Sequence, residues 1–256
     1  MLITNESLYS YLLYSDPVKY SDDLTLYPIT MDKILEFSMY KQSIIVRKNS
    51  TFTSKQIIKM SYLQFLYHCH GNVELAKEYN MPLLPLYYSF AFQLLKLAFK
   101  EQDVKVNIEK GGFLINDKEV DDDMFDDIRR IIILQNGIDF DIDEFIHYDT
   151  EQELKKAEEH VSGKDNATLE DYIDSLCVAL GVNEEYVRTL TIRKFWRYVK
   201  RISKRDIFQI MKSAESTGMV KFNEPLSYWM TELDTGDKYK NVKTDSETIK
   251  KMVSGN

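Results

Sequence analysis

The sequence predicts a mainly α protein, in which a helical domain with one small β-hairpin precedes a smaller helical C-terminal part. Glycine and proline, which interrupt helices and are common in loop-rich β-sandwiches, number only nine and five in 256 residues. Apolar residues recur at helical spacing through most of the chain. A single segment, residues 104–120, changes to the two-residue period of a strand. Together these observations favour helices over sheets.

The N-terminal domain, residues 1–160, is predicted to pack several short helices around one helix that is apolar nearly all round. Thr30 and Ser54 are expected N-caps, and either Asp122 or Asp123 is expected to cap a helix that Gly137 ends. The predicted elements are a helix at 8–13, a strand at 24–29, helices from 31, at 54–70, at 73–79 and at 85–100, a hairpin at 104–120 turned by Gly111 and Gly112, and the helix before Gly137.

The C-terminal domain, residues 168–230, is predicted to contain three helices. A polar helix at 151–160 and a linker at 161–167 precede it, and we place the domain boundary in that linker. Thr168 and Asp171 are spaced for a capping box, and Gly181 is placed to end the helix they begin. Asn183 begins a short helix, and a long basic helix follows at 191–217. Residues 231–256 are predicted to form an extended tail.

Two adjacent blocks of opposite charge are the main functional signal in the sequence. Residues 117–171 contain nineteen Asp and Glu against six Lys and Arg, whereas residues 188–212 contain nine basic residues against one acid. The chain as a whole carries a net charge of -8. Blocks of opposite sign attract each other within one molecule, or each attracts a partner.

The basic helix is predicted to be amphipathic, with a cationic partner-binding face. Its apolar residues, Phe195, Val199, Ile202 and Phe208 or Met211, are expected to face inward. Three uses of the cationic face stay open: pairing with acids of this chain or a partner, phosphate binding, or exposure to solvent. A pI of 5.2 disfavours phosphate binding. The residues of this face are Arg193, Lys194, Arg197, Lys200, Arg201 and Lys204.

No combination of residues in the sequence indicates catalysis, a metal or a cofactor. His68, Cys69 and His70 lack a second ligand pair at zinc spacing, so core packing at a helix end accounts for them better. Residues 139–144 (DFDIDE) resemble the start of a calcium loop, but Glu144 and Thr150 stand where that loop requires Gly and Glu. An irregular divalent site stays open there. We find no phosphate-binding glycine loop and no nucleophile elbow, and expect no enzyme.

The cysteines and the N-terminus favour a cytoplasmic location. Cys69 and Cys177 are far apart without a repeated spacing, which is typical of a reducing compartment. The first residues lack the charged and apolar regions of a signal peptide. The longest apolar stretch, residues 81–99, is interrupted by proline, glutamine and lysine and is not expected to span a membrane.

The order of segments resembles the tail assembly chaperones of phages and prophages of Gram-positive bacteria. The similarity covers most of the chain, although its motifs are structural and of modest specificity. It is carried by residues 24–30 (LTLYPIT) with the helix that follows, the hairpin at 106–120, residues 125–136 (FDDIRRIIILQN), the acidic segment up to Glu159, residues 190–202 (LTIRKFWRYVKRI) and residues 226–230 (LSYWM).

This resemblance implies a non-enzymatic morphogenesis protein that binds the tape-measure protein and aids assembly of the tail tube. The implied partners are the tape-measure or tail tube protein, with self-association as a further option and without nucleic acid or membrane. One alternative is a minor tail or neck protein that stays in the virion. Another is a phage regulator that binds nucleic acid through the basic helix, and a third is a metal-dependent enzyme built on the acids of residues 121–144.

Overall fold

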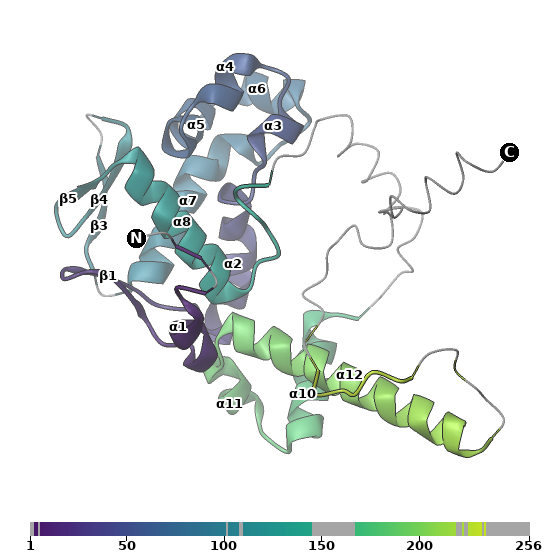
Figure 1. Ribbon diagram of the computed structural model, residues 1–256. Coiled ribbons are helices and arrows are strands. Elements are labelled where there is room, and N and C mark those ends of the chain that lie inside the picture. The colour runs from purple at the N-terminus through teal and green to yellow at the C-terminus, as the bar shows by residue number, and fades with distance from the viewer. Residues whose placement is uncertain are drawn as a thin grey trace, which may run out of the picture.

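The structure, a computed structural model, confirms a mainly α fold with small β elements (Figure 1). The residues that it describes are 3–4, 6–100, 102–107, 110–144, 167–218, 222, 225–231 and 233. The predicted polar helix at 151–160, the boundary at 161–167 apart from Ala167, and most of the predicted tail at 231–256 lie outside these residues.

The N-terminal part consists of short helices around a longer one, α7. The largely apolar segment predicted at 85–100 is this helix, and it contacts α2, α5 and the strands β2 (Leu24–Leu26) and β3 (Val104–Asn107). The helices are α1 (Tyr9–Tyr14), the 3₁₀ helix η1 (Met31–Lys33), α2 (Ile34–Tyr40), η2 (Lys41–Ser43), α3 (Lys48–Thr51), α4 (Lys55–Lys59), α5 (Tyr62–Cys69), α6 (Val73–Glu78), η3 (Leu84–Leu86), α7 (Tyr87–Phe99) and α8 (Asp122–Asn136).

The described residues form two small antiparallel sheets, and one of them contains the predicted hairpin with a third strand added. Strands β1 (Val18–Ser21) and β2 (Leu24–Leu26) form one of them. The other contains β3 (Val104–Asn107), β4 (Gly112–Ile115) and β5 (Lys118–Val120) in that order. The third strand arises because Asn116 and Asp117, both with positive φ, turn the chain back after Ile115. Asn and Asp tolerate positive φ better than most residues, so the Asn-Asp sequence at 116–117 is itself a turn signal.

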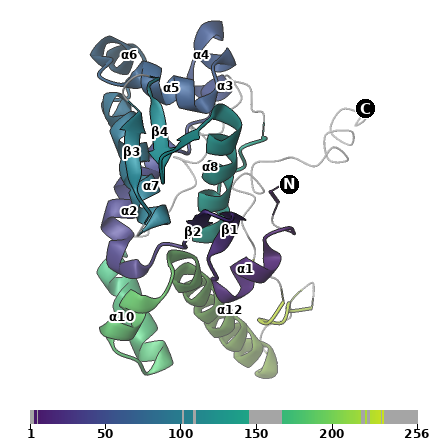
Figure 2. The same cartoon turned by 90° about the vertical axis from the view of Figure 1, so that its left-hand side faces the viewer.

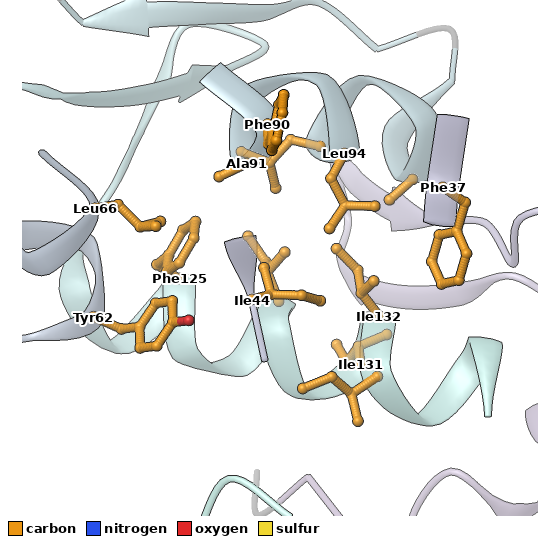
Figure 3. Close-up of a cluster of buried hydrophobic side chains, with 14 of the residues drawn as sticks. Phe37, Ile44, Tyr62, Leu66, Phe90, Ala91, Leu94, Phe125, Ile131 and Ile132 are labelled. Atoms are coloured by element: carbon orange, nitrogen blue, oxygen red, sulfur yellow. The ribbon is translucent and has the colours of Figure 1, made fainter. Parts of the chain in front are cut away.

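The apolar core lies between α7, α8 and the helices around them. Figure 3 shows side chains from α2, α5, α7 and α8 pointing at one another, among them Phe37, Leu66, Leu94 and Phe125. Phe125 and Leu66 are almost completely buried. Burial of this apolar area is the main stabilising contribution to the fold.

The single helix predicted at 54–70 is wrong, because the chain breaks between α4 and α5. The carbonyl of Met60 accepts a hydrogen bond from Lys48 Nζ, and the Ser61 hydroxyl donates to Asp122 Oδ1 at 2.6 Å. Ser61 also caps α5 by accepting a bond from the Gln64 backbone at 3.1 Å. Partners from elsewhere in the fold thus replace the helical hydrogen bonds at this point.

Other predicted helix ends are confirmed or shifted by one residue. Asp121, rather than Asp122 or Asp123, caps α8 by accepting from the Met124 backbone at 2.8 Å, and Gly137 ends the helix in the left-handed region. Thr30 and Ser54 precede their helices without a side-chain capping bond.

The C-terminal part contains three helices, α10 (Leu169–Leu180), α11 (Glu184–Thr189) and α12 (Ile192–Ser216). Thr168 and Asp171 form the predicted capping box, and Asn183 caps α11 as predicted. Thr191 caps α12, and Gly218 follows its end with positive φ. The helices gather at one end of the molecule, and α12 begins against the body and points away from it (Figures 1 and 2).

A short backbone bridge joins α12 to the N-terminal part. Thr30 and Thr191 pair as an antiparallel bridge, with hydrogen bonds from Met31 N to the Leu190 carbonyl at 2.8 Å and from Ile192 N to the Ile29 carbonyl at 2.9 Å. Behind it, the buried side chains of Ile192, Phe195, Val187 and Leu176 belong to the same apolar cluster as the N-terminal core. This joint fixes where the first turns of α12 lie.

Candidate functional site

A cleft of about 660 Å³ separates the first turns of α12 from the end of α8 and the loop that follows it. Its floor is apolar and includes Ile133, Leu134 and Ile138. Both walls carry charged or aromatic side chains. The further lining residues are Ile3, Thr4, Arg130, Gly137, Asp139, Phe140, Asp141, Ile142, Arg193, Trp196, Arg197, Lys200 and Leu233.

Three of the six predicted site residues, Arg193, Arg197 and Lys200, line this cleft from α12. Arg193 is fixed in place, since its Nη1 donates to the Leu12 carbonyl at 2.8 Å. Burial lowers the pKa of its guanidinium, and the nearby Arg197 lowers it further. Arg197 and Lys200 are exposed, and neither forms a hydrogen bond or an ion pair with any residue that the structure describes. These two cations of the cleft thus have no partner among the residues that the structure describes.

The other three predicted residues, Lys194, Arg201 and Lys204, bind polar groups of this chain. Lys194 Nζ donates to the Leu13 carbonyl, and burial, with the neighbouring Arg193 and Arg197, lowers the pKa of its amine. Arg201 Nη1 donates to the carbonyls of Trp229 and Thr231, the second at 2.8 Å. Lys204 Nζ donates to Thr231 Oγ1 at 2.9 Å. These contacts hold α1 and residues 229–231 against α12.

Trp196 is the one aromatic side chain that α12 contributes to the cleft. Its ring packs edge-on against Tyr172 of α10, with centroids 5.2 Å apart, and against Phe195, with centroids 5.0 Å apart. Phe195 is fully buried. The α10 contact therefore fixes the direction in which Trp196 meets the cleft.

The opposite wall is an acidic loop that two arginines hold in place. Arg130 forms a two-pronged ion pair with Asp143 at 2.6 and 3.0 Å, which lowers the pKa of that carboxyl group. Arg47 Nη2 binds Glu144 at 2.7 Å, and its guanidinium lies over the Phe140 ring, 4.8 Å from the centroid. Asp143 and Glu144 of this loop are thus paired with Arg130 and Arg47. Neither arginine belongs to the predicted cationic face of α12.

Metal-ligand clusters are absent from the described part of the chain, where no group of three or more His, Cys, Asp or Glu side chains converges. Cys69 is fully buried, and burial raises the pKa of its thiol to about 12. His68 and His70 are exposed on either side of it. Asp143 and Glu144 of the calcium-like loop are paired with arginines instead. The structure thus buries Cys69 in the core and pairs these two loop acids with arginines.

The distal half of α12 carries exposed apolar side chains, and Met211, one of the two alternatives predicted to face inward, is among them. Phe195 is buried and Ile202 is half-buried against the core, but the exposed fractions of Ile207, Ile210 and Met211 are 52%, 70% and 40%. The helix continues beyond the body that covers its first half (Figures 1 and 2). We call Ile207, Ile210 and Met211 the distal stripe.

Residues 225–231 lie along α12 beside the distal stripe (Figure 1). The rings of Phe208 and Tyr228 meet edge-on with centroids 5.4 Å apart, next to the hydrogen bonds that Arg201 and Lys204 make to this segment. Tyr228 and Met230 are themselves exposed at 51% and 62%. The segment adds apolar area to one flank of the stripe and leaves the stripe uncovered.

The fold and the site define a mainly α protein whose long terminal helix presents a charged cleft at one end and exposed apolar side chains at the other. Residues 155–234 match the family model described as the YomV second domain, a Bacillus prophage family. The match covers just under a third of the chain and includes α10, α11 and all of α12. No curated protein and no solved structure matches the chain. Its C-terminal part is thus similar to a phage-associated domain.

None of the helices in the described part of the chain combines the length and the apolar content that crossing a membrane requires.

Proposed function

We propose that this protein is a non-enzymatic phage morphogenesis protein, a tail assembly chaperone that binds the tape-measure protein and aids assembly of the tail tube in the host cytoplasm. The observation that carries the proposal is the distal stripe of α12. Apolar side chains gathered on a projecting helix mark an interaction site, because their exposure to water is unfavourable. The similarity of this segment to a prophage domain supports a role in a phage.

The partner chemistry of a tape-measure protein fits such a surface. The resemblance implies a long helical protein, and an isolated helix with an apolar stripe aggregates unless another protein covers that stripe. A helix that offers its own apolar stripe outside the body of the fold can supply this cover by packing side chains between side chains. No catalytic step is needed for this activity.

Co-expression with the tape-measure protein of the same phage or prophage tests the proposal. We expect the tape-measure protein to stay in the soluble fraction and to co-purify with the wild-type chain. The double variant Ile207→Ser/Ile210→Ser should lose both effects and keep its melting temperature, because both side chains are exposed. Val178→Ser is the matched control, since Val178 is an 85% exposed apolar residue on α10. A tape-measure protein that stays insoluble with the wild-type chain would refute the role.

The nucleic-acid alternative makes an opposite prediction. Arg193, Lys194, Arg201 and Lys204 donate to groups of this chain, which leaves Arg197 and Lys200 of the predicted face for phosphates. Two cations neutralise too few phosphates for tight binding, since affinity grows with the number of phosphate contacts. We expect the wild type not to retard duplex DNA or RNA at low salt. A regulator would bind, lose affinity steeply between about 50 and 200 mM salt, and lose binding when Arg197, Lys200 and Lys204 are changed to Glu.

The alternative hypothesis, a minor tail or neck protein, involves the same surface. It differs in that the protein would remain in the mature virion. A chaperone leaves before the particle is complete, so the protein should be absent from purified particles. Stoichiometric recovery of the chain in washed virions, measured by mass spectrometry, would instead support a minor tail or neck protein.

A further inference from the structure

The cleft cations and the distal stripe lie along one face of α12. Successive residues of an α-helix are rotated by about 100°, so residues three or four apart share a face. Trp196 and Lys200 line the cleft, Ile207 follows seven residues after Lys200, and Ile210 and Met211 follow Ile207 by three and four. This face begins at the cleft and continues towards the end of α12, the helix that projects from the body in Figure 1. From residue 196 to residue 214 it spans about 27 Å at 1.5 Å per residue.

The two ends of this face differ in charge. At the cleft end, Arg197 and Lys200 have no ion-pair partner among the described residues. Towards the projecting end, Arg205 pairs with Asp206 at 3.0 Å and Lys212 pairs with Glu215 at 2.7 Å. A complementary partner must therefore offer carboxylates at one end and apolar side chains at the other.

We propose that α12 docks an amphipathic helix of a partner protein, whose acidic end lies over Arg197 and Lys200 and whose apolar end covers Ile207, Ile210 and Met211. This inference rests on the proposed function and specifies the chemistry of the segment that is bound. A helix fits because an extended apolar face on a single helix is covered by another helix lying along it.

A second copy of this chain fits the face less well than an acidic partner does. Two α12 helices packed through their distal stripes would bring no unpaired carboxylate of α12 itself near Arg197 and Lys200. The acids of α12 are Asp206, which pairs with Arg205 at 3.0 Å, and Glu215, which pairs with Lys212. A foreign helix with acids at one end satisfies both halves of the face.

Binding of designed peptides to the full-length protein tests the proposal. The probes are three fluorescent helical peptides of about 20 residues that share a leucine stripe and differ in three residues at one end, which are Glu, Gln or Lys. We expect the Glu peptide to bind about 3- to 10-fold more tightly than the Gln peptide, since two exposed charge pairs contribute modestly. The Lys peptide should bind most weakly.

Two variants localise the contacts. Arg197→Glu/Lys200→Glu should reverse the order of the peptides, so that the Lys peptide binds best. Ile207→Ser/Ile210→Ser should weaken all three peptides about tenfold or more, because it removes the apolar contact. Val178→Ser should leave every affinity unchanged. All these side chains are exposed, so unchanged melting temperatures will show that the variants are folded.

Several outcomes would overturn the proposal. They are equal affinity for the Glu and Gln peptides, no binding of any peptide, or binding that Ile207→Ser/Ile210→Ser does not weaken. A dimer in sedimentation experiments that the same variant dissociates would make a second copy the occupant. If binding requires Glu151, Glu153, Glu158 and Glu159 to be changed to Gln, the chain's own acidic segment is the occupant.

The two proposals fail separately. A charge-dependent peptide result without solubilisation of the tape-measure protein would refute the chaperone role alone. Solubilisation that depends on Ile207 and Ile210, but not on Arg197 and Lys200, would refute the acidic-helix inference alone.

Discussion

Replacing Gly137 by alanine tests whether the end of α8 and the first turn of α12 are packed as the structure shows. Gly137 ends α8 with φ 64° and ψ 36°, and Gly181 ends α10 with φ 66° and ψ 36°. The two residues thus adopt almost the same left-handed conformation. A Cβ on Gly181 would meet nothing within 4 Å, whereas a Cβ on Gly137 would lie 3.1 Å from Cγ of Arg193. Gly181→Ala is therefore a matched control.

Gly137→Ala is expected to lose more stability than Gly181→Ala, because only the new Cβ at position 137 would press against Arg193. An L-residue in the left-handed region costs about 1–2 kcal/mol, and this applies to both variants. Gly137→Ala adds an overpacking cost of about 1–3 kcal/mol, because Arg193 is held by its bond to the Leu12 carbonyl and cannot move without weakening it. Gly137→Ala should thus reduce the free energy of unfolding by about 2–5 kcal/mol in total.

Urea denaturation followed by circular dichroism measures both values, provided that the m-values of the variants equal that of the wild type. Equal losses in the two variants would show that Arg193 does not pack against Gly137, and would refute the placement of α12 against α8. A neutral Gly181→Ala would refute the argument from left-handed strain.

Four further predictions concern the core, the titrating groups, metals and the loop of the cleft. Phe195→Ala should destabilise the protein by about 3–5 kcal/mol in urea titrations, because Phe195 is fully buried where α12 meets the core. Burial raises the pKa of Cys69 from 9.0 to about 12 and that of Tyr62 from 10.0 to about 12. Their contribution to stability is therefore fully present below about pH 9 and lost as the pH rises towards 12, and urea midpoints across that range should fall. EDTA should leave the melting temperature unchanged, and a drop of several degrees that zinc or calcium reverses would contradict this. Asp143→Asn should cost about 1 kcal/mol or less, because the carboxyl group is 69% exposed, and a larger loss in urea would show a tighter bond to Arg130.

The sequence alone determined the helices whose ends are fixed by local contacts. Thr168 and Asp171 bond within one helical turn, and Asn183 and Thr191 accept bonds from the third residue after each. Such contacts involve only neighbouring residues, so the residue types and their spacing are enough to predict them. The mainly α class followed for the same reason.

Contacts between distant residues decided the features that the sequence analysis missed. The break between α4 and α5 depends on Lys48 and Asp122, which lie 12 and 61 residues away from the groups they bind. The acidic loop after α8 pairs with Arg47, 97 residues from Glu144. A pattern of residue types does not specify which of many arginines and carboxylates meet, because that choice depends on how the helices pack.

The candidate site shows the same division along a single helix. Periodicity predicted that α12 is amphipathic and that Arg193, Arg197 and Lys200 share a face. It could not show that Phe195 is buried while Ile207 and Ile210 are exposed, because residue types and their spacing do not reveal which part of α12 the core covers. The difference arises because the core that covers the first half of α12 ends before the helix does. Periodicity defines the faces of a helix, and only tertiary packing determines how much of its apolar face is buried.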